Sequence, residues 1–140
     1  MARADKFTLE GKKREIYSDF LNNFDMNPYT GMLARVTNED SVKQSLKNLI
    51  LTNCGERFYN SNKGSKIRAS LFELYDQGLF DIMKLQLAQT CAFWEPRAII
   101  QKINVNPGFD SNEYAVTIVF SIINIPDRQF SLDLNVKRVR

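Results

Sequence analysis

Histidine is absent from this chain of 140 residues. Its absence excludes Ser-His-Asp and Cys-His catalysis and every metal site that needs an imidazole ligand. Cysteine is scarce, and Cys54 and Cys91 alone are too few for a zinc site or a disulfide framework. We expect both to be reduced thiols in apolar, helical surroundings, in a protein made in the cytosol.

Long apolar runs are also lacking. No stretch approaches the roughly 20 apolar residues that cross a bilayer, and the N-terminal segment has no apolar region of a secretory signal. The chain has no Walker A, GxGxxG, GxSxG or EF-hand motif either. We therefore expect no membrane association, no cofactor, no metal and no small-molecule substrate.

The composition is that of an ordinary folded domain, with 44% hydrophobic and 25% charged residues. The net charge of +3 is uneven, because residues 1–16 carry five basic and three acidic groups and residues 128–140 carry four basic and one. Nucleic-acid-binding domains concentrate positive charge on a folded face, so we expect no nucleic-acid partner. We expect a basic arm over residues 1–16 and a single domain over residues 17–140.

Helical spacing of apolar residues predicts three helices. The first begins near Asn38, where Thr37 and Asp40 have the spacing of a capping box, and Gly55 can end it. The second runs over residues 66–77 and is closed by Gly78. The third covers residues 79–94, is apolar on much of its circumference, and therefore belongs at the centre of the core.

From residue 98 the apolar period changes to two, which is typical of strands. Ile99, Ile103 and Val105 are expected to share one face, and the turns are expected near residues 106–108 and 124–127. The predicted fold class is α+β, a two-layer domain with three helices packed on a three-stranded antiparallel β-meander. Six apolar residues should be buried together between the layers: Leu46, Leu49, Leu71, Leu87, Phe120 and Leu132.

The carboxylates form no catalytic pattern. A glycosidase needs two of them across a cleft, one with a raised pKa. Glu73 and Asp76 share a solvated helix face, which is typical of surface residues. We therefore expect no enzymatic activity.

Glu95-Pro96-Arg97 lies at the junction between the third helix and the first strand of the meander. Proline restricts the backbone, and in an extended segment Glu95 and Arg97 would point the same way. Two interpretations stay open: an internal ion pair that joins helix to strand, or a rigid docking point for a partner chain.

Three further residues also have two interpretations. Trp94 is a core residue or an interface residue. Arg57 and Phe58 lie in a loop with Gly55 and Gly64, which is either a plain connection or an anchor for a partner.

Several segments, in this order, closely resemble the small baseplate wedge protein family of contractile-tailed phages, historically called lysozyme-like, and its relative in the type VI secretion baseplate. The resemblance covers about residues 17–138. The matching segments are Thr30-Gly31, Ser41 to Thr52, Gly55-Glu56-Arg57-Phe58, Gly64-Ser65, Leu71-Phe72-Glu73 and Trp94-Glu95-Pro96-Arg97.

The resemblance implies a structural role in six copies in the inner baseplate of the virion tail, assembled in the cytoplasm of the host bacterium. It implies that Glu95, Pro96 and Arg97 hold the core bundle formed by two larger wedge proteins. It also implies that the sheet exchanges strands with the tail sheath subunit and so templates the first sheath ring. The open edges of a three-stranded sheet agree with such an exchange.

The alternative function is a small hydrolase that acts on peptidoglycan, as the historical name suggests. Turnover of cell wall would favour the hydrolase, and binding to a wedge complex would favour the assembly role. Within the assembly role we expect a phage tail, with a tailocin or a type VI secretion baseplate as the alternatives.

Overall fold

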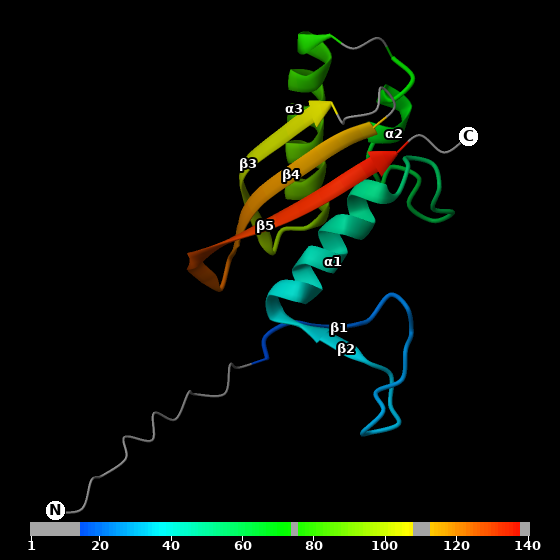
Figure 1. The fold of residues 1–140 in the computed structure, drawn as a ribbon, viewed down its shortest axis with the longest axis vertical. Coiled ribbons are helices and arrows are strands. Elements are labelled where there is room, and N and C mark those ends of the chain that lie inside the picture. The colour runs from blue at the N-terminus through cyan, green and yellow to red at the C-terminus, as the bar shows by residue number, and fades with distance from the viewer. Residues whose placement is uncertain (1–14, 74–75, 108–112, 138–140) are drawn as a thin grey trace, which may run out of the picture.

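The computed structural model describes residues 15–73, 76–107 and 113–137. It is a mixed α/β structure with three helices and antiparallel sheets (Figure 1). The elements are β1 (Ser18–Phe20), β2 (Arg35–Thr37), α1 (Asn38–Leu51), α2 (Ile67–Ser70), α3 (Gln77–Trp94), β3 (Ala98–Pro107), β4 (Glu113–Ile122) and β5 (Ile125–Lys137). The expected arm over residues 1–16 lies almost wholly outside the described residues.

Helix α1 begins where the sequence predicts, but its ends differ from the prediction. Thr37 precedes the helix in an extended conformation, yet its side chain makes no capping hydrogen bond. The helix ends at Leu51, and Thr52 is already extended. Gly55 therefore does not end the helix. It lies in the following loop at φ +90°, in the left-handed region that favours glycine.

The second expected helix is wrong in length. Helix α2 stops at Ser70, where the buried hydroxyl of Tyr114 donates a hydrogen bond of 2.9 Å to the Ser70 carbonyl. Tertiary packing thus provides a partner for a carbonyl at the end of the short helix. The predicted helix end at Gly78 is also wrong, because Gly78 lies in the first turn of α3.

Helix α3 buries one stripe rather than most of its circumference. Met83, Leu87 and Cys91, spaced four residues apart, are buried, whereas Ile82 and Leu85 are more than half exposed. The expectation of a central helix is therefore wrong, and α3 packs against β3 with one face only. Both cysteines are free thiols, as expected; the expected apolar, helical surroundings are confirmed for Cys91 and wrong for Cys54, which is exposed in the turn after α1.

The larger sheet has the strand order β3-β4-β5, with both pairs antiparallel. A bulge interrupts β3 at Gln101, because Ile100 pairs with Phe120 and Lys102 with the neighbouring Val119. The extra residue reverses the face to which the preceding residues point. Ile99 is consequently exposed on the other face, and its predicted placement beside Ile103 is wrong.

The turn between β4 and β5 is shorter than expected and lies earlier in the chain. It consists of Ile123 and Asn124, and β5 already begins at Ile125. Pro126 and Asp127 therefore belong to β5. Proline is tolerated there because β5 is an edge strand of the described sheet.

Strands β1 and β2 form a second, two-stranded sheet that the sequence pattern did not reveal as a pair. A turn over residues 27–31 lies between them, and the Gly31 N–H donates to the Asn27 carbonyl. Figure 1 shows this hairpin projecting away from the larger sheet, below the start of α1. Its connecting segment exposes large apolar side chains: Phe24, Met26, Tyr29 and Met32.

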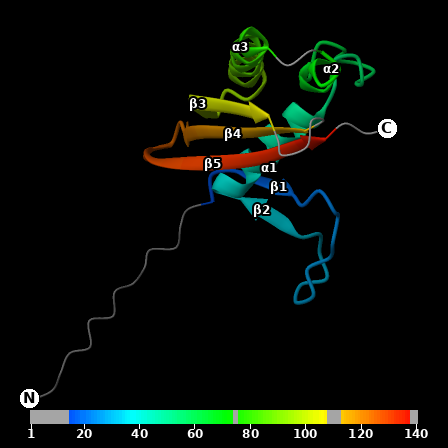
Figure 2. The same ribbon diagram turned by 45° about the horizontal axis from the view of Figure 1, so that its top comes forward.

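One face of the larger sheet carries the core. Alternate residues of β4 from Tyr114 to Ile122 are fully buried, and Figures 1 and 2 show α1 and α3 on that side of the sheet. The six residues predicted to be buried together all belong to one cluster, which confirms that prediction. In the described part of the chain, no helix has the length and apolar character needed to cross a bilayer.

Candidate functional site

The candidate site starts at the junction where α3 ends. Glu95 leaves the helix, and the Ala98 N–H donates to the Glu95 carbonyl at 3.1 Å. The segment from Glu95 to Ala98 is therefore a tight turn and not the extended stretch that the sequence suggested. The two side chains nevertheless meet, because the turn brings Glu95 and Arg97 to the same side.

Arg97 forms a bidentate salt bridge with Glu95. Its Nε lies 2.5 Å from Oε1 of Glu95, and its Nη2 lies 2.8 Å from Oε2. The hydroxyl of Ser45 on α1 donates to the same Oε2. Glu95 is only 4% exposed, whereas the side chain of Arg97 is 33% exposed. The internal ion pair of the first interpretation is therefore present, and it leaves part of the guanidinium at the surface.

These hydrogen-bond donors favour the ionised form of Glu95. Burial raises the pKa of the carboxyl, but the hydrogen bonds from Arg97 and Ser45 and the charges of Arg97 and Lys63 more than offset this, so the pKa lies below its ordinary value. The hydrogen bond to Glu95 correspondingly raises the pKa of Arg97. Both groups are ionised at neutral pH.

Arg97 also connects the junction to distant parts of the chain. Its guanidinium carbon lies 5.3 Å from the ring centroid of Tyr17, which precedes β1. Its carbonyl accepts the N–H of Ile123 at 3.0 Å. The Tyr17 hydroxyl in turn accepts a hydrogen bond of 2.6 Å from the side chain of Asn124. The turn after α3, the turn after β4 and the start of β1 thus meet at Arg97.

A cleft of about 180 Å³ opens beside Ser45, between α1, the loop after it and the end of α3. The Lys63 ammonium lies 5.5 Å from the centroid of the Trp94 ring. The lining residues are Asp19, Ser45, Asn48, Leu49, Thr52, Arg57, Lys63 and Trp94.

The structure brings together some of the predicted site residues and separates others. Trp94 and Arg57 line the cleft, and Glu95 reaches its wall through Ser45. Pro96 lines a different depression, between α3 and β3. Phe58 is fully exposed in the loop and does not line the cleft.

Sequence reasoning missed Ser45, Tyr17 and Lys63 as members of the site. Ser45 is one polar residue among several on α1, and Tyr17 lies 80 positions before Arg97. The Glu95–Arg97 pair was indicated by its close spacing in the chain and by the family resemblance.

The chemistry of the junction does not resemble that of a glycosidase. A general acid needs a carboxyl group with a raised pKa, whereas the pKa of Glu95 is lowered. Among the described residues, no group of three histidine, cysteine, aspartate or glutamate side chains is arranged to hold a metal ion. The junction is suited to holding an arginine in place.

Comparison with known proteins adds a family to this geometry. Residues 36–126 match the family model described as "Baseplate wedge protein gp25". The chain is 28% identical over 113 residues to the baseplate wedge protein gp25 of Enterobacteria phage T4, covering 81% of this chain and 85% of that protein.

Solved structures show the same fold. One is a putative tail lysozyme from Geobacter sulfurreducens, with a TM-score of 0.65, 16% identity, and coverage of 73% of this chain and 92% of that one. Another is a chain of the anti-feeding prophage baseplate, with a TM-score of 0.61, 18% identity, and coverage of 89% and 87%. Because the family model spans more than half of the sequence, the chain belongs to the baseplate wedge protein gp25 family.

Proposed function

We propose that this protein is a structural, non-enzymatic component of the inner baseplate of a contractile phage tail. In this role the two-layer domain of residues 17–140, with its helices packed on the three-stranded meander, is the working unit. It is present in six copies, and residues 1–16 form a basic arm. Family membership and the likeness to the phage T4 protein support the proposal.

The docking element is Glu95-Pro96-Arg97, which holds the core bundle of two larger wedge proteins. The observation that supports docking through this motif is the salt bridge between the buried Glu95 carboxylate and the partly exposed Arg97. Nε and one Nη2 hydrogen are engaged internally, so Nη1 remains available to acceptors of a partner. Because its position is fixed before binding, Arg97 loses little conformational entropy when it docks. In this proposal Trp94, Arg57 and Phe58 are further residues that contact the partner.

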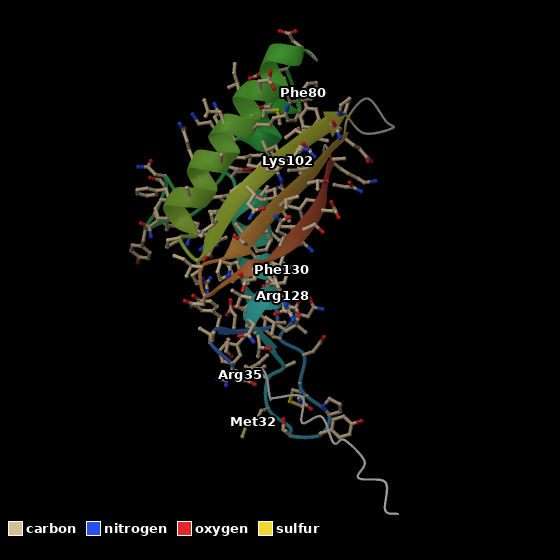
Figure 3. All side chains as sticks on the ribbon, turned by 90° about the vertical axis from the view of Figure 1, so that its left-hand side faces the viewer. Met32, Arg35, Phe80, Lys102, Arg128 and Phe130 are labelled. Atoms are coloured by element: carbon tan, nitrogen blue, oxygen red, sulfur yellow. The ribbon has the colours of Figure 1, made fainter. Side chains whose placement is uncertain are left out.

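The docking proposal is tested by substituting Arg97 and measuring affinity for the purified pair of larger wedge proteins. Arg97→Ala should lose about 2–5 kcal/mol of binding, since acceptors of the partner are left unpaired. Arg97→Lys should lose nearly as much, because an ammonium cannot reproduce the fork. The matched control is Arg35→Ala, since Arg35 stacks on Phe20 at 5.6 Å but lies on the hairpin (Figure 3).

Stability has to be measured on the same samples, because Arg97→Ala also removes the main partner of a buried carboxylate. Binding is therefore compared at a temperature where circular dichroism shows every variant folded. If folded Arg97→Ala binds the wedge pair like the wild type, the docking proposal is wrong.

The second part of the proposal is that the larger sheet accepts a strand of the tail sheath subunit and so templates the first sheath ring. Both β3 and β5 are edge strands of the described sheet, and free edges accept added strands. We place the exchange at β3, because an open groove of about 710 Å³ lies between β3 and α3 and gives an added strand an apolar surface. Its apolar lining includes Leu85, Ala88, Ala92 and Ile99.

A charge placed in this groove tests the strand exchange. Ile99→Asp should reduce sheath polymerisation from assembled baseplates, while wedge binding stays unchanged. Ile82→Asp is the matched control, because Ile82 is similarly exposed but does not line the groove. Normal sheath growth on Ile99→Asp baseplates would exclude β3 as the accepting edge.

A further inference from the structure

We propose that the cleft between Trp94 and the loop of residues 55–64 is a binding site for a carboxylate side chain of the wedge partner. This inference rests on the proposed function and adds a second anchor of defined chemistry beside Arg97. The anchor would take one aspartate or glutamate, presented by a segment whose neighbouring side chains are apolar.

The charges of the cleft favour an anion. Arg57 and Lys63 both line it, and within the described part of the chain neither forms an ion pair with a carboxylate. Asp19 is the single acidic lining residue, and its Oδ1 accepts the N–H of Phe20. The nearby charge of Glu95 is balanced by Arg97. With two cations against one carboxylate, the lining of the cleft keeps a net positive charge, although Lys63 also contacts the Trp94 ring and is attracted by the charge of Glu95.

The size of the cleft favours one side chain. Pockets for small-molecule ligands measure roughly 300–1,000 Å³, and this cleft holds about 180 Å³. The Trp94 ring and Leu49 provide apolar walls for the methylene groups of an acidic side chain. Arg57 and Lys63 then supply charged donors for its carboxylate.

The loop that carries both cations is anchored to the body of the protein. The Gly55 N–H donates to the Ser61 carbonyl at 2.7 Å, and the Ser65 hydroxyl donates to the Ile50 carbonyl at 2.6 Å. Gly64 is packed so closely against the Thr52 carbonyl that a Cβ atom would lie 2.7 Å from it. Because the loop is already ordered, it loses less conformational entropy when the partner binds.

The same loop indicates what surrounds the acidic side chain. Phe58 and Tyr59 follow Arg57 directly and are fully exposed. Exposed aromatic side chains next to a charged anchor are typical of interface centres. We therefore expect apolar residues on either side of the acidic residue in the partner segment.

The cleft can first be tested in the isolated protein, because Trp94 is the only tryptophan. The ratio of iodide to caesium quenching should be higher for Trp94 than for free tryptophan, since the cleft attracts anions. Arg57→Ala and Lys63→Ala should each reduce the ratio of iodide to caesium quenching, and Arg128→Ala, at an exposed site on β5, should leave it unchanged. A ratio in the wild type no higher than that of free tryptophan would overturn the inference.

The second test measures affinity for the purified wedge pair. Arg57→Glu and Lys63→Glu should each lower the affinity by about ten- to a hundredfold, and the salt dependence of binding should become weaker. Arg128→Glu, which makes the same change of charge, should bind like the wild type.

The outcomes separate this inference from the docking proposal. If Arg97→Lys loses binding while Arg57→Glu and Lys63→Glu retain it, the acid-binding cleft is wrong and the docking proposal stands. If all three bind normally, both are wrong.

Discussion

At the scale of single residues, the most constrained group is the carboxylate of Glu95. It is buried and accepts hydrogen bonds from Arg97 and Ser45, two side chains that approach from different elements. A buried charge with such partners contributes to stability only while it stays ionised. Acid should therefore weaken the join between α1 and the end of α3.

Glu95 gives the folding stability a defined dependence on pH. Its pKa in the folded state is lowered from an ordinary value of 4.5. The stabilisation is thus complete above that ordinary value and is lost as pH falls through the folded pKa. Urea unfolding at pH 7 and pH 3 should show a larger loss for the wild type than for Glu95→Gln. Equal losses in the two proteins would contradict the assignment.

The two cysteines should differ sharply in reactivity. Burial, reinforced by the charge of Glu95, raises the pKa of Cys91 to about 11, so this thiol stays neutral and shielded. Cys54 is exposed. Iodoacetamide should add once to the native protein and twice to the protein in urea, as measured by mass spectrometry. Two additions to the native protein would show that Cys91 is accessible.

At the scale of elements, the sequence predicts best those helices and strands that bury one face. The spacing of Val42, Leu46 and Ile50 located α1, and strict alternation located β4. The bulge at Gln101 was missed, because a period of two does not show where an extra residue enters a strand. Strands β1 and β2 were missed as a pair, because they are short and largely exposed.

The candidate site was predictable to the same degree. Glu95 and Arg97 are two residues apart, so their meeting could be anticipated from the chain itself. Ser45 and Lys63 reach the site only through the packing of α1 against the end of α3, which no local pattern encodes.

Helix α3 offers a test of its register. Leu87→Ala should lower the free energy of unfolding by about 2–5 kcal/mol, because Leu87 is 2% exposed in the core. Leu85→Ala on the same helix should change it by less than about 0.5 kcal/mol, because Leu85 is 60% exposed. Chemical denaturation of both variants measures these free energies of unfolding. Similar losses in the two variants would show that the helix is rotated.

The loop after α1 depends on Gly64. Its φ of +142° and the 2.7 Å approach to the Thr52 carbonyl leave no room for a side chain. Gly64→Ala should therefore add an overpacking cost of about 1–3 kcal/mol to the cost of backbone strain. Gly31→Ala is the control, because Gly31 also has a positive φ but has open space around it, so strain alone should cost about 1–2 kcal/mol. Equal melting temperatures for the two variants would contradict the close approach.

At the scale of the whole molecule, exposed apolar groups gather at the hairpin connection, at the loop after α1 and in the groove between α3 and β3. The hairpin connection exposes Tyr29 and Met32, and the loop after α1 exposes Phe58 and Tyr59. Figure 3 shows Met32 far from the larger sheet, near the tip of the hairpin. Such surfaces are typical of proteins that work inside an assembly, in agreement with a role in a baseplate wedge.

The order of the elements has a consequence for synthesis on the ribosome. Helix α1 is made early, but it packs against β5, the last described strand, through a core that includes Leu132 and Leu134. The apolar face of α1 therefore stays uncovered until β5 is translated. A chain released before β5 leaves that face bare and open to proteases. Only copies that include β5 would then have this face covered.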